Sequence, residues 1–127
     1  MARAYRPRMS SLAGSVAKER TLRLVVRGRK TGQPREATIW FVADGDDLLV
    51  GTLDDARNWV RNARANTAVE VEVGGRRLRG RFDDAVDEAT RERGRSGIAA
   101  KYLVARIAGW FGIRQKHVFR IRDLRAA

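Results

Sequence analysis

The sequence predicts a mainly β protein with helices (an α+β fold), in which six antiparallel strands close into a small barrel. Several short runs alternate apolar and polar residues, as do strands that turn one face toward a core. Asp-Gly and Gly-Gly pairs, at residues 44–45 and 74–75, are typical of hairpin turns. With 127 residues the chain is long enough for one core. A closed barrel would let so short a chain avoid exposed strand edges.

The first part of the chain predicts an arm and then three strands. Residues 1–18 are small, polar and basic, which indicates a short helix or a loose arm. We therefore expect an N-terminal arm at residues 1–20 and a single barrel domain at residues 21–127. Strands are expected at residues 21–27, 36–43 and 48–52, arranged as an antiparallel meander.

A short helix is expected next, at residues 56–65. Trp59, Val60 and Ala63 lie there at helical spacing. Asp54 and Asp55 precede them, and short acidic side chains at such a place can cap free N–H groups and suit the positive end of the helix dipole.

The second part predicts three more strands and further helix. The elements expected there are strands at 68–73, 77–84 and 116–122, a charged helix at 87–95, and a mostly apolar helical segment at 98–113. The apolar segment could cover the barrel mouth, contact another subunit or lie on a membrane surface. We expect the first two uses ahead of the third.

Composition excludes several kinds of site. The chain has no cysteine, so disulfides, thiolate catalysis and cysteine-bound zinc are excluded. Its one histidine, His117, is expected to be a half-buried packing residue of the last strand. The net charge of +12 attracts anions, but the cations are dispersed along the chain. No run of about 18 uncharged apolar residues exists, and a cytoplasmic protein is expected.

The most informative motif is the turn at residues 27–35, Arg-Gly-Arg-Lys-Thr-Gly-Gln-Pro-Arg. Gly28 and Gly32 can adopt positive φ, so the chain can turn sharply there and expose backbone N–H groups. Cationic side chains and the Thr31 hydroxyl would surround that turn with donors. Such a turn can hold a phosphate, although a solvated basic hairpin has the same composition.

Three blocks of sequence, in this order, resemble the deazaflavin-dependent nitroreductase family. They are Gly28-Arg29-Lys30-Thr31-Gly32-x-x-Arg35 before an apolar strand, Gly51-Thr52 followed by Arg57-Asn58-Trp59-Val60-Arg61-Asn62 and Ala65-Asn66, and the hairpin at residues 73–80. The resemblance implies a split β-barrel like that of pyridoxamine 5′-phosphate oxidase. It also implies an enzyme in which reduced coenzyme F420 donates hydride to an electron-poor acceptor: a quinone, a nitroaromatic or an enone.

The resemblance further implies a set of cofactor-binding residues. Those at the phosphate would be Arg29, Lys30, Thr31, Gly32 and Arg35, with Trp59 and Asn62 closing that end from the short helix. Trp40, Gly51 and Thr52 would lie near the ring. The catalytic residue stays unknown; Tyr102 is a weak candidate for a proton donor, and core packing is expected of it first.

Some departures from the family pattern keep other functions open. Acidic Asp54 and Asp55 stand where many family members have a lysine that helps to neutralise the phosphate. An FMN-binding oxidoreductase on the same barrel is the first alternative. A basic nucleic-acid-binding barrel is a weaker one, because the chain has few aromatic residues and most fall at expected core positions, so no nucleic-acid partner is expected. A homodimer and a weak peripheral contact with the inner face of the membrane stay open.

Overall fold

The computed structural model describes residues 11–102, 107 and 117–127. Within these ranges the helices are α1 (Leu12–Ser15), α2 (Asn58–Ala65) and α3 (Glu88–Lys101). The strands are β1 (Leu22–Arg27), β2 (Pro34–Ile39), β3 (Phe41–Asp44), β4 (Asp47–Thr52), β5 (Ala68–Val73), β6 (Arg76–Asp83) and β7 (His117–Ala126). No helix in the described ranges is long and apolar enough to cross a bilayer.

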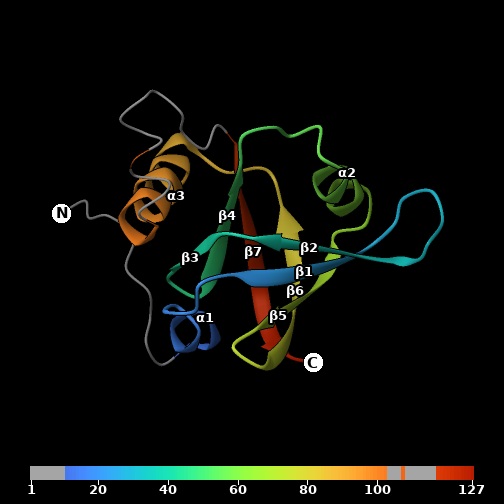
Figure 1. Cartoon of the computed structure of the whole chain (residues 1–127), viewed down its shortest axis with the longest axis horizontal. Coiled ribbons are helices and arrows are strands. Elements are labelled where there is room, and N and C mark those ends of the chain that lie inside the picture. The colour runs from blue at the N-terminus through green and yellow to red at the C-terminus, as the bar shows by residue number, and fades with distance from the viewer. Residues whose placement is uncertain (1–10, 103–106, 108–116) are drawn as a thin grey trace.

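All seven strands belong to one antiparallel sheet, in the order β2-β1-β5-β6-β7-β4-β3. The two end strands, β2 and β3, follow each other in the chain with only Trp40 between them. The sheet must therefore curl until its ends meet, which Figure 1 shows as a barrel with the helices around it. This confirms the predicted split-barrel class.

One strand prediction needs a correction, because residues 36–43 form parts of two strands. Ile39 at the end of β2 pairs with Leu22 of β1, whereas Phe41 at the start of β3 pairs with Val50 of β4. The chain thus changes its partner strand at Trp40. The six expected strands are otherwise present, with ends shifted by a few residues, and β7 continues to Ala126.

The barrel interior is filled by the apolar side chains of alternating strand residues. In β1 these are Leu22, Leu24 and Val26, each no more than 2% exposed, while the residues between them are half-buried or exposed. The interior cluster also includes Phe41, Leu48, Val50, Val60, Ala63, Val69, Val71, Val73, Leu78, Phe82, Phe119 and Ile121. Burial of this set is the main source of stability for the barrel.

A second apolar layer lies outside the barrel, beneath α3. Val42, Leu49 and Val118 point outward from β3, β4 and β7 and pack against Ile98 and Tyr102. This layer explains why β3 and β4 are apolar on both faces. The charged helix predicted at residues 87–95 extends to Lys101, and its N-cap is Asp87, whose side chain accepts a hydrogen bond from the Thr90 N–H.

Ion pairs hold α3 and the β3–β4 hairpin to the barrel. Arg93 of α3 donates two hydrogen bonds of 3.1 Å to the carboxylate of Asp44, and Arg120 of β7 lies 3.2 Å from Asp47. Burial raises the pKa of Asp47, and the nearby Arg120 partly opposes that effect. These contacts are structural, because the first connects α3 to β3 and the second connects β7 to β4.

The structure describes only part of the expected N-terminal arm, residues 1–20, and of the expected apolar segment, residues 98–113. Residues 11–20 of the expected arm contain α1, whose Ala13 and neighbouring Val16 are buried in the interior cluster. The rest of the arm, residues 1–10, lies outside the described ranges. The segment expected at residues 98–113 is described at residues 98–102, which end α3, and at Ile107, which is 42% exposed.

Candidate functional site

The predicted phosphate turn is the loop of the β1–β2 hairpin. The Gly28 N–H donates to the Gln33 carbonyl at 2.8 Å, and the Gly32 N–H donates to the Gly28 carbonyl at 2.9 Å. Gly32 has a φ of +73°, as expected, whereas Gly28 does not have positive φ. At Gly28 the space is tight instead: a Cβ there would lie 3.1 Å from the Thr31 hydroxyl oxygen and 3.2 Å from the Gln33 carbonyl oxygen. Two backbone hydrogen bonds therefore close the turn, with Gly32 in the left-handed conformation.

Helix α2 lies against this hairpin and is joined to it by two asparagines. The Asn62 side-chain oxygen accepts hydrogen bonds from the Arg29 backbone N–H at 3.0 Å and from the Arg29 guanidinium at 2.7 Å. The Asn66 side-chain amide donates to the Arg27 carbonyl at 3.1 Å. Figure 1 shows α2 beside the base of the hairpin, whose tip extends past the helix. The Trp-x-x-Asn helix α2 therefore holds the basic turn in place through these hydrogen bonds.

The prediction that Asp54 or Asp55 caps helix α2 is wrong. The N-cap residue is Arg57, and no side chain caps the first turn. Asp54 instead accepts a hydrogen bond from the Ala56 N–H at 2.9 Å, which closes a local turn before the helix. Asp55 lies 3.3 Å from Arg64, which is also bonded to Asp84. Asp54 thus takes part in a local turn, and Asp55 forms an ion pair with an arginine of α2.

The first of two hollows lies between the β1–β2 hairpin, the β2 strand and α2. It has a volume of about 1290 Å³. It is lined by Gly28, Arg29, Lys30, Thr31, Pro34, Arg35, Glu36, Ala37, Ala56, Arg57, Asn58, Trp59 and Asn62. Six of the ten predicted cofactor residues are in this set. Asp54 and Asp55 are absent from it, so the acidic departure from the family pattern does not place carboxylates in the hollow.

A smaller hollow of about 300 Å³ adjoins the first. It is lined by Ala37, Thr38, Ile39, Trp40, Gly51, Thr52, Leu53, Arg57 and Trp59. Ala37, Arg57 and Trp59 line both hollows, so the two hollows are neighbours. The structure therefore brings the predicted ring residues next to the predicted phosphate residues. Gly32 is the exception, because it lines a separate hollow with Arg27 and Arg79.

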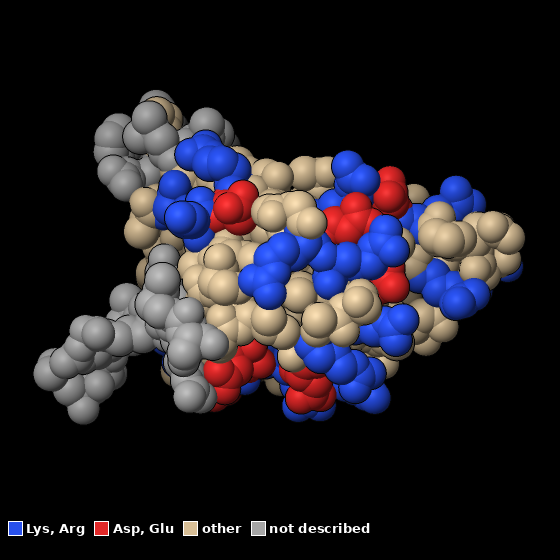
Figure 2. All heavy atoms as spheres, turned by 90° about the horizontal axis from the view of Figure 1, so that it is seen from below, with Lys and Arg blue, Asp and Glu red and all other residues tan. Residues whose placement is uncertain are grey.

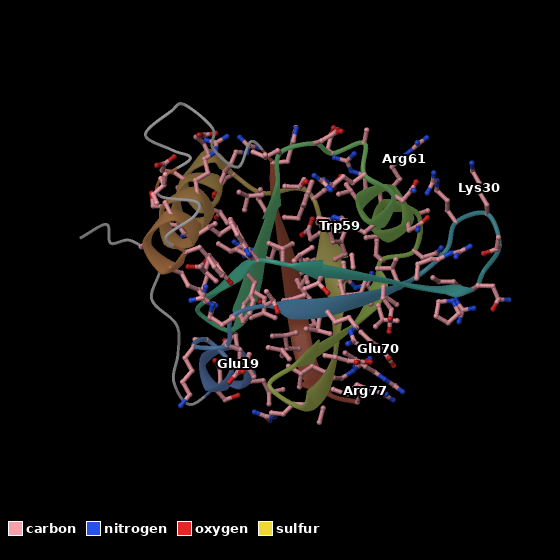
Figure 3. The ribbon with its side chains drawn as sticks, viewed as in Figure 1. Glu19, Lys30, Trp59, Arg61, Glu70 and Arg77 are labelled. Carbon is pink, nitrogen blue, oxygen red and sulfur yellow. The ribbon has the colours of Figure 1, made fainter. Side chains whose placement is uncertain are left out.

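The first hollow is lined by several cations that have no carboxylate partner among the described residues. Arg29, Lys30, Arg35 and Arg57 line it, and none of them has a carboxylate within 4 Å in the part of the chain that the structure describes. Arg61 of α2 is unpaired in the same sense, and Figure 3 shows it on the same side of the molecule as Lys30 at the hairpin.

On other parts of the surface, some arginines are paired with carboxylates. Figure 2 shows one face on which Asp and Glu lie among Lys and Arg. Arg23 lies 3.3 Å from Glu72 and 3.6 Å from Glu36, and Arg64 lies 2.8 Å from Asp84. The unpaired cations of the hollow therefore keep their charge for an anion from outside the chain.

The turn also offers uncharged donors. The Thr31 hydroxyl accepts a hydrogen bond from the Gln33 N–H at 3.2 Å, so its own proton is left for another acceptor. Among the described residues, no acceptor is bonded to the backbone N–H of Lys30 or of Thr31. Guanidinium, ammonium, hydroxyl and backbone N–H groups together are the donor types that bind phosphate.

The sequence prediction missed several residues that line the first hollow, among them Arg57 and Asn58. Asn58 accepts a weak hydrogen bond from Arg29 at 3.5 Å, and Arg57 borders both hollows. Both residues stand directly before Trp59 in the Arg-Asn-Trp block. The sequence signal that could have identified Arg57 is a basic residue at the start of the helix that follows the cationic turn.

Trp59 connects the core with the hollows. Its ring contacts Phe82 and Phe119 edge-on, with centroids 6.3 Å and 6.0 Å away, and the side chain is half-buried. Figure 3 shows Trp59 pointing from α2 toward the barrel. One edge of this ring is thus fixed by the core while the rest forms a wall shared by the two hollows.

Tyr102, the weak candidate for a proton donor, lines neither hollow. It is 2% exposed, its ring stacks on Trp40 with centroids 4.6 Å apart, and its hydroxyl donates to the Arg20 carbonyl at 2.5 Å. The hydroxyl also accepts from the Phe41 N–H at 3.2 Å. These contacts give Tyr102 the packing role that was expected first.

Lys101 lies beside Tyr102 and is unusual in its protonation. Its ammonium group donates to the Phe41 carbonyl at 3.0 Å and lies 3.7 Å from the centre of the Phe41 ring. Burial, with a smaller contribution from the neighbouring Arg20, lowers the pKa of Lys101 to about 8. This group is also outside both hollows.

Comparison with known proteins indicates a family and agrees with the fold. Residues 1–105 match the F420H(2)-dependent quinone reductase family. F420H(2)-dependent quinone reductases from two strains of Mycobacterium tuberculosis are 36% identical over 62 residues, a segment that covers 46% of this chain and 42% of each relative. The matched segment thus spans less than half of those relatives.

Two solved structures have a similar fold. A candidate pyridoxamine 5′-phosphate oxidase from Listeria innocua superposes with a TM-score of 0.62 at 18% identity, covering 87% of this chain and 90% of that one. An F420-H2 dependent reductase superposes with a TM-score of 0.60 at 16% identity, covering 80% and 93%. At such identities the likeness concerns the fold alone, and it supports the split barrel.

Proposed function

The chain belongs to the F420H(2)-dependent quinone reductase family, and we propose that it binds reduced coenzyme F420 and uses it to reduce a quinone. The phosphate end of the cofactor would lie in the first hollow, held by Arg29, Lys30, Thr31 and Arg35. The ring would lie in the adjoining hollow. This assignment rests on the family, on the cationic lining of the first hollow and on the aromatic lining of the second.

The observation that carries the proposal is the unpaired cationic lining of the first hollow. The cofactor has a phosphate and a polyanionic oligoglutamate tail, and both need cations that are not already neutralised. Arg29, Lys30, Arg35 and Arg57 meet that need within the described ranges, since no carboxylate lies within 4 Å of them. Glu36 is the one acidic lining residue, and its carboxylate lies 3.6 Å from Arg23. The donor set therefore fits the cofactor.

The second hollow suits a planar ring. Trp40 and Trp59 supply aromatic surface, and Gly51, which has no side chain, would let a ring edge approach the backbone of β4. When bound, the reduced cofactor supplies a hydride, and the protein's contribution is to position the reactants and exclude water. The rigid stacking of Trp40 on Tyr102 and the edge contacts of Trp59 with the core would keep these walls in place.

The direct test is a titration of the protein with coenzyme F420 and, separately, with FMN, following cofactor fluorescence. Saturable binding of F420 together with weak or absent FMN binding is the expected result. A second measurement follows oxidation of the reduced cofactor by a soluble naphthoquinone. Binding of FMN alone would favour the flavin alternative, and binding of neither would refute the proposal.

A further inference from the structure

Asn62 has an unusual relation to Arg29, the first cation of the turn. It is 5% exposed, and its single side-chain oxygen accepts both the backbone N–H and the guanidinium of Arg29. Two donors at 3.0 Å and 2.7 Å can be satisfied only by the oxygen of the amide, so the orientation of this side chain is determined. One residue of α2 thus holds a loop residue 33 positions away through main chain and side chain together.

The chemical type of this contact differs from that of the arginines that are held by carboxylates. Arg93 is held by the carboxylate of Asp44, and Arg64 by the carboxylate of Asp84. A carboxylate at position 62 could accept the same two hydrogen bonds from Arg29. It would also cancel the charge of the guanidinium, which an amide does not.

Asn66 is a natural comparison, because it joins the same helix to the same hairpin. Its amide bonds the Arg27 carbonyl at 3.1 Å and touches no cation of the hollow. Asn66 therefore connects the helix to the hairpin as Asn62 does, but it has no hydrogen bond with the Arg29 guanidinium.

From this geometry we infer that Asn62 is a positioning residue: it orients the Arg29 guanidinium toward the first hollow and, because it is neutral, leaves the full positive charge for the bound anion. The identity of that anion as the phosphate of F420 rests on the proposed function. The orienting role itself does not, because both hydrogen bonds are present in the protein alone.

The inference is tested with Asn62→Ala, Asn62→Asp and the control Asn66→Ala. Thermal unfolding first identifies the variants that fold. Hydrogen exchange of the Arg29 backbone N–H, followed by NMR without ligand, then reports its order. We expect fast exchange in Asn62→Ala, and protection close to that of the wild type in Asn62→Asp and Asn66→Ala. Unchanged protection in Asn62→Ala would overturn the orienting role.

Anion affinity tests the second half of the inference. Asn62→Asp should keep Arg29 ordered yet bind F420 about tenfold or more weakly, because the new carboxylate pairs with the guanidinium. Asn66→Ala should stay within about twofold of the wild type. Wild-type affinity in Asn62→Asp would overturn the claim that a neutral acceptor is needed.

A double-variant cycle separates positioning from direct contact. In an Arg29→Ala background, Asn62→Ala should change F420 affinity by no more than about twofold, since its effect passes through Arg29. A further large loss would mean that Asn62 binds the anion itself, and the inference would be wrong.

Inorganic phosphate distinguishes failure of this inference from failure of the proposed function. If the wild type binds phosphate at the turn but not F420, the proposed function fails, and the same variants are compared with phosphate. If the wild type binds neither, the anion-binding half of the inference fails as well, while Arg29 exchange still decides the orienting role.

Discussion

Replacing Tyr102 with phenylalanine separates a structural role from a chemical one. The change keeps the ring that stacks on Trp40 and removes only a hydroxyl that is bonded to the Arg20 carbonyl at 2.5 Å and to the Phe41 N–H at 3.2 Å. Tyr102 is 2% exposed, so the Phe41 N–H loses this acceptor where water has little access. Such a loss costs about 1–3 kcal/mol. In a domain of this size that corresponds to a fall in Tm of roughly 3–15 °C.

The assay for Tyr102→Phe combines thermal unfolding with F420 titration and quinone reduction at a temperature where both proteins are folded. The expected result is a lower Tm with unchanged cofactor affinity and unchanged kcat, because Tyr102 lines neither hollow. An unchanged Tm with a large fall in kcat would refute this reasoning and restore Tyr102 as a proton donor.

Three other side chains give further predictions. Lys30→Ala should weaken F420 binding at least several-fold in a fluorescence titration, because a charge-assisted phosphate bond contributes about 1.5–3 kcal/mol; an equal loss in the control Lys18→Ala would indicate unspecific attraction instead. The pKa of Lys101 is about 8 in the folded protein and 10.5 ordinarily, so between these pH values the unfolded chain binds more protons than the folded one. The free energy of unfolding of the wild type, measured in urea, should therefore rise between pH 8 and pH 10.5 relative to that of Lys101→Met. If the free energies of the two proteins change with pH in parallel, the effect of burial on Lys101 is contradicted. Asp44→Asn removes the carboxylate that holds Arg93 of α3 and should cost about 1–3 kcal/mol in thermal unfolding, since Asp44 is 13% exposed; an unchanged Tm would show that this pair does not secure the helix.

Most strand positions could be predicted because burial on one face imposes a period of two. The alternation of Leu22, Leu24 and Val26 with more exposed neighbours appears in β1 as expected. The break at Trp40 could not be predicted, because the alternation continues through it: Ile39 and Phe41 both belong to the interior cluster. A change of partner strand leaves the side-chain period intact, so no pattern in the sequence reports it.

Local rules also failed at the start of α2. Asp54 and Asp55 have the composition of a helix cap, but the structure uses them in a turn and in an ion pair with Arg64. Capping depends on where the chain enters the helix, and here the path from β4 places the first helical residue at Asn58. Asp54 takes part in a local turn, and Asp55 pairs with Arg64, nine positions away, which composition at the start of the helix does not reveal.

The sequence by itself determined the local features: the hairpin turns, the strand faces, and the concentration of cations, glycines and a hydroxyl at residues 27–35. These depend on residues close in the chain, so composition and spacing are enough to predict them. Only the tertiary structure decided what distant residues do for one another. Closure of the barrel brings α2 against the first hairpin, where Asn62 meets Arg29, and it buries Tyr102 against Phe41. A hydrogen bond needs its two groups within about 3 Å, and for segments far apart in sequence only the fold provides that proximity.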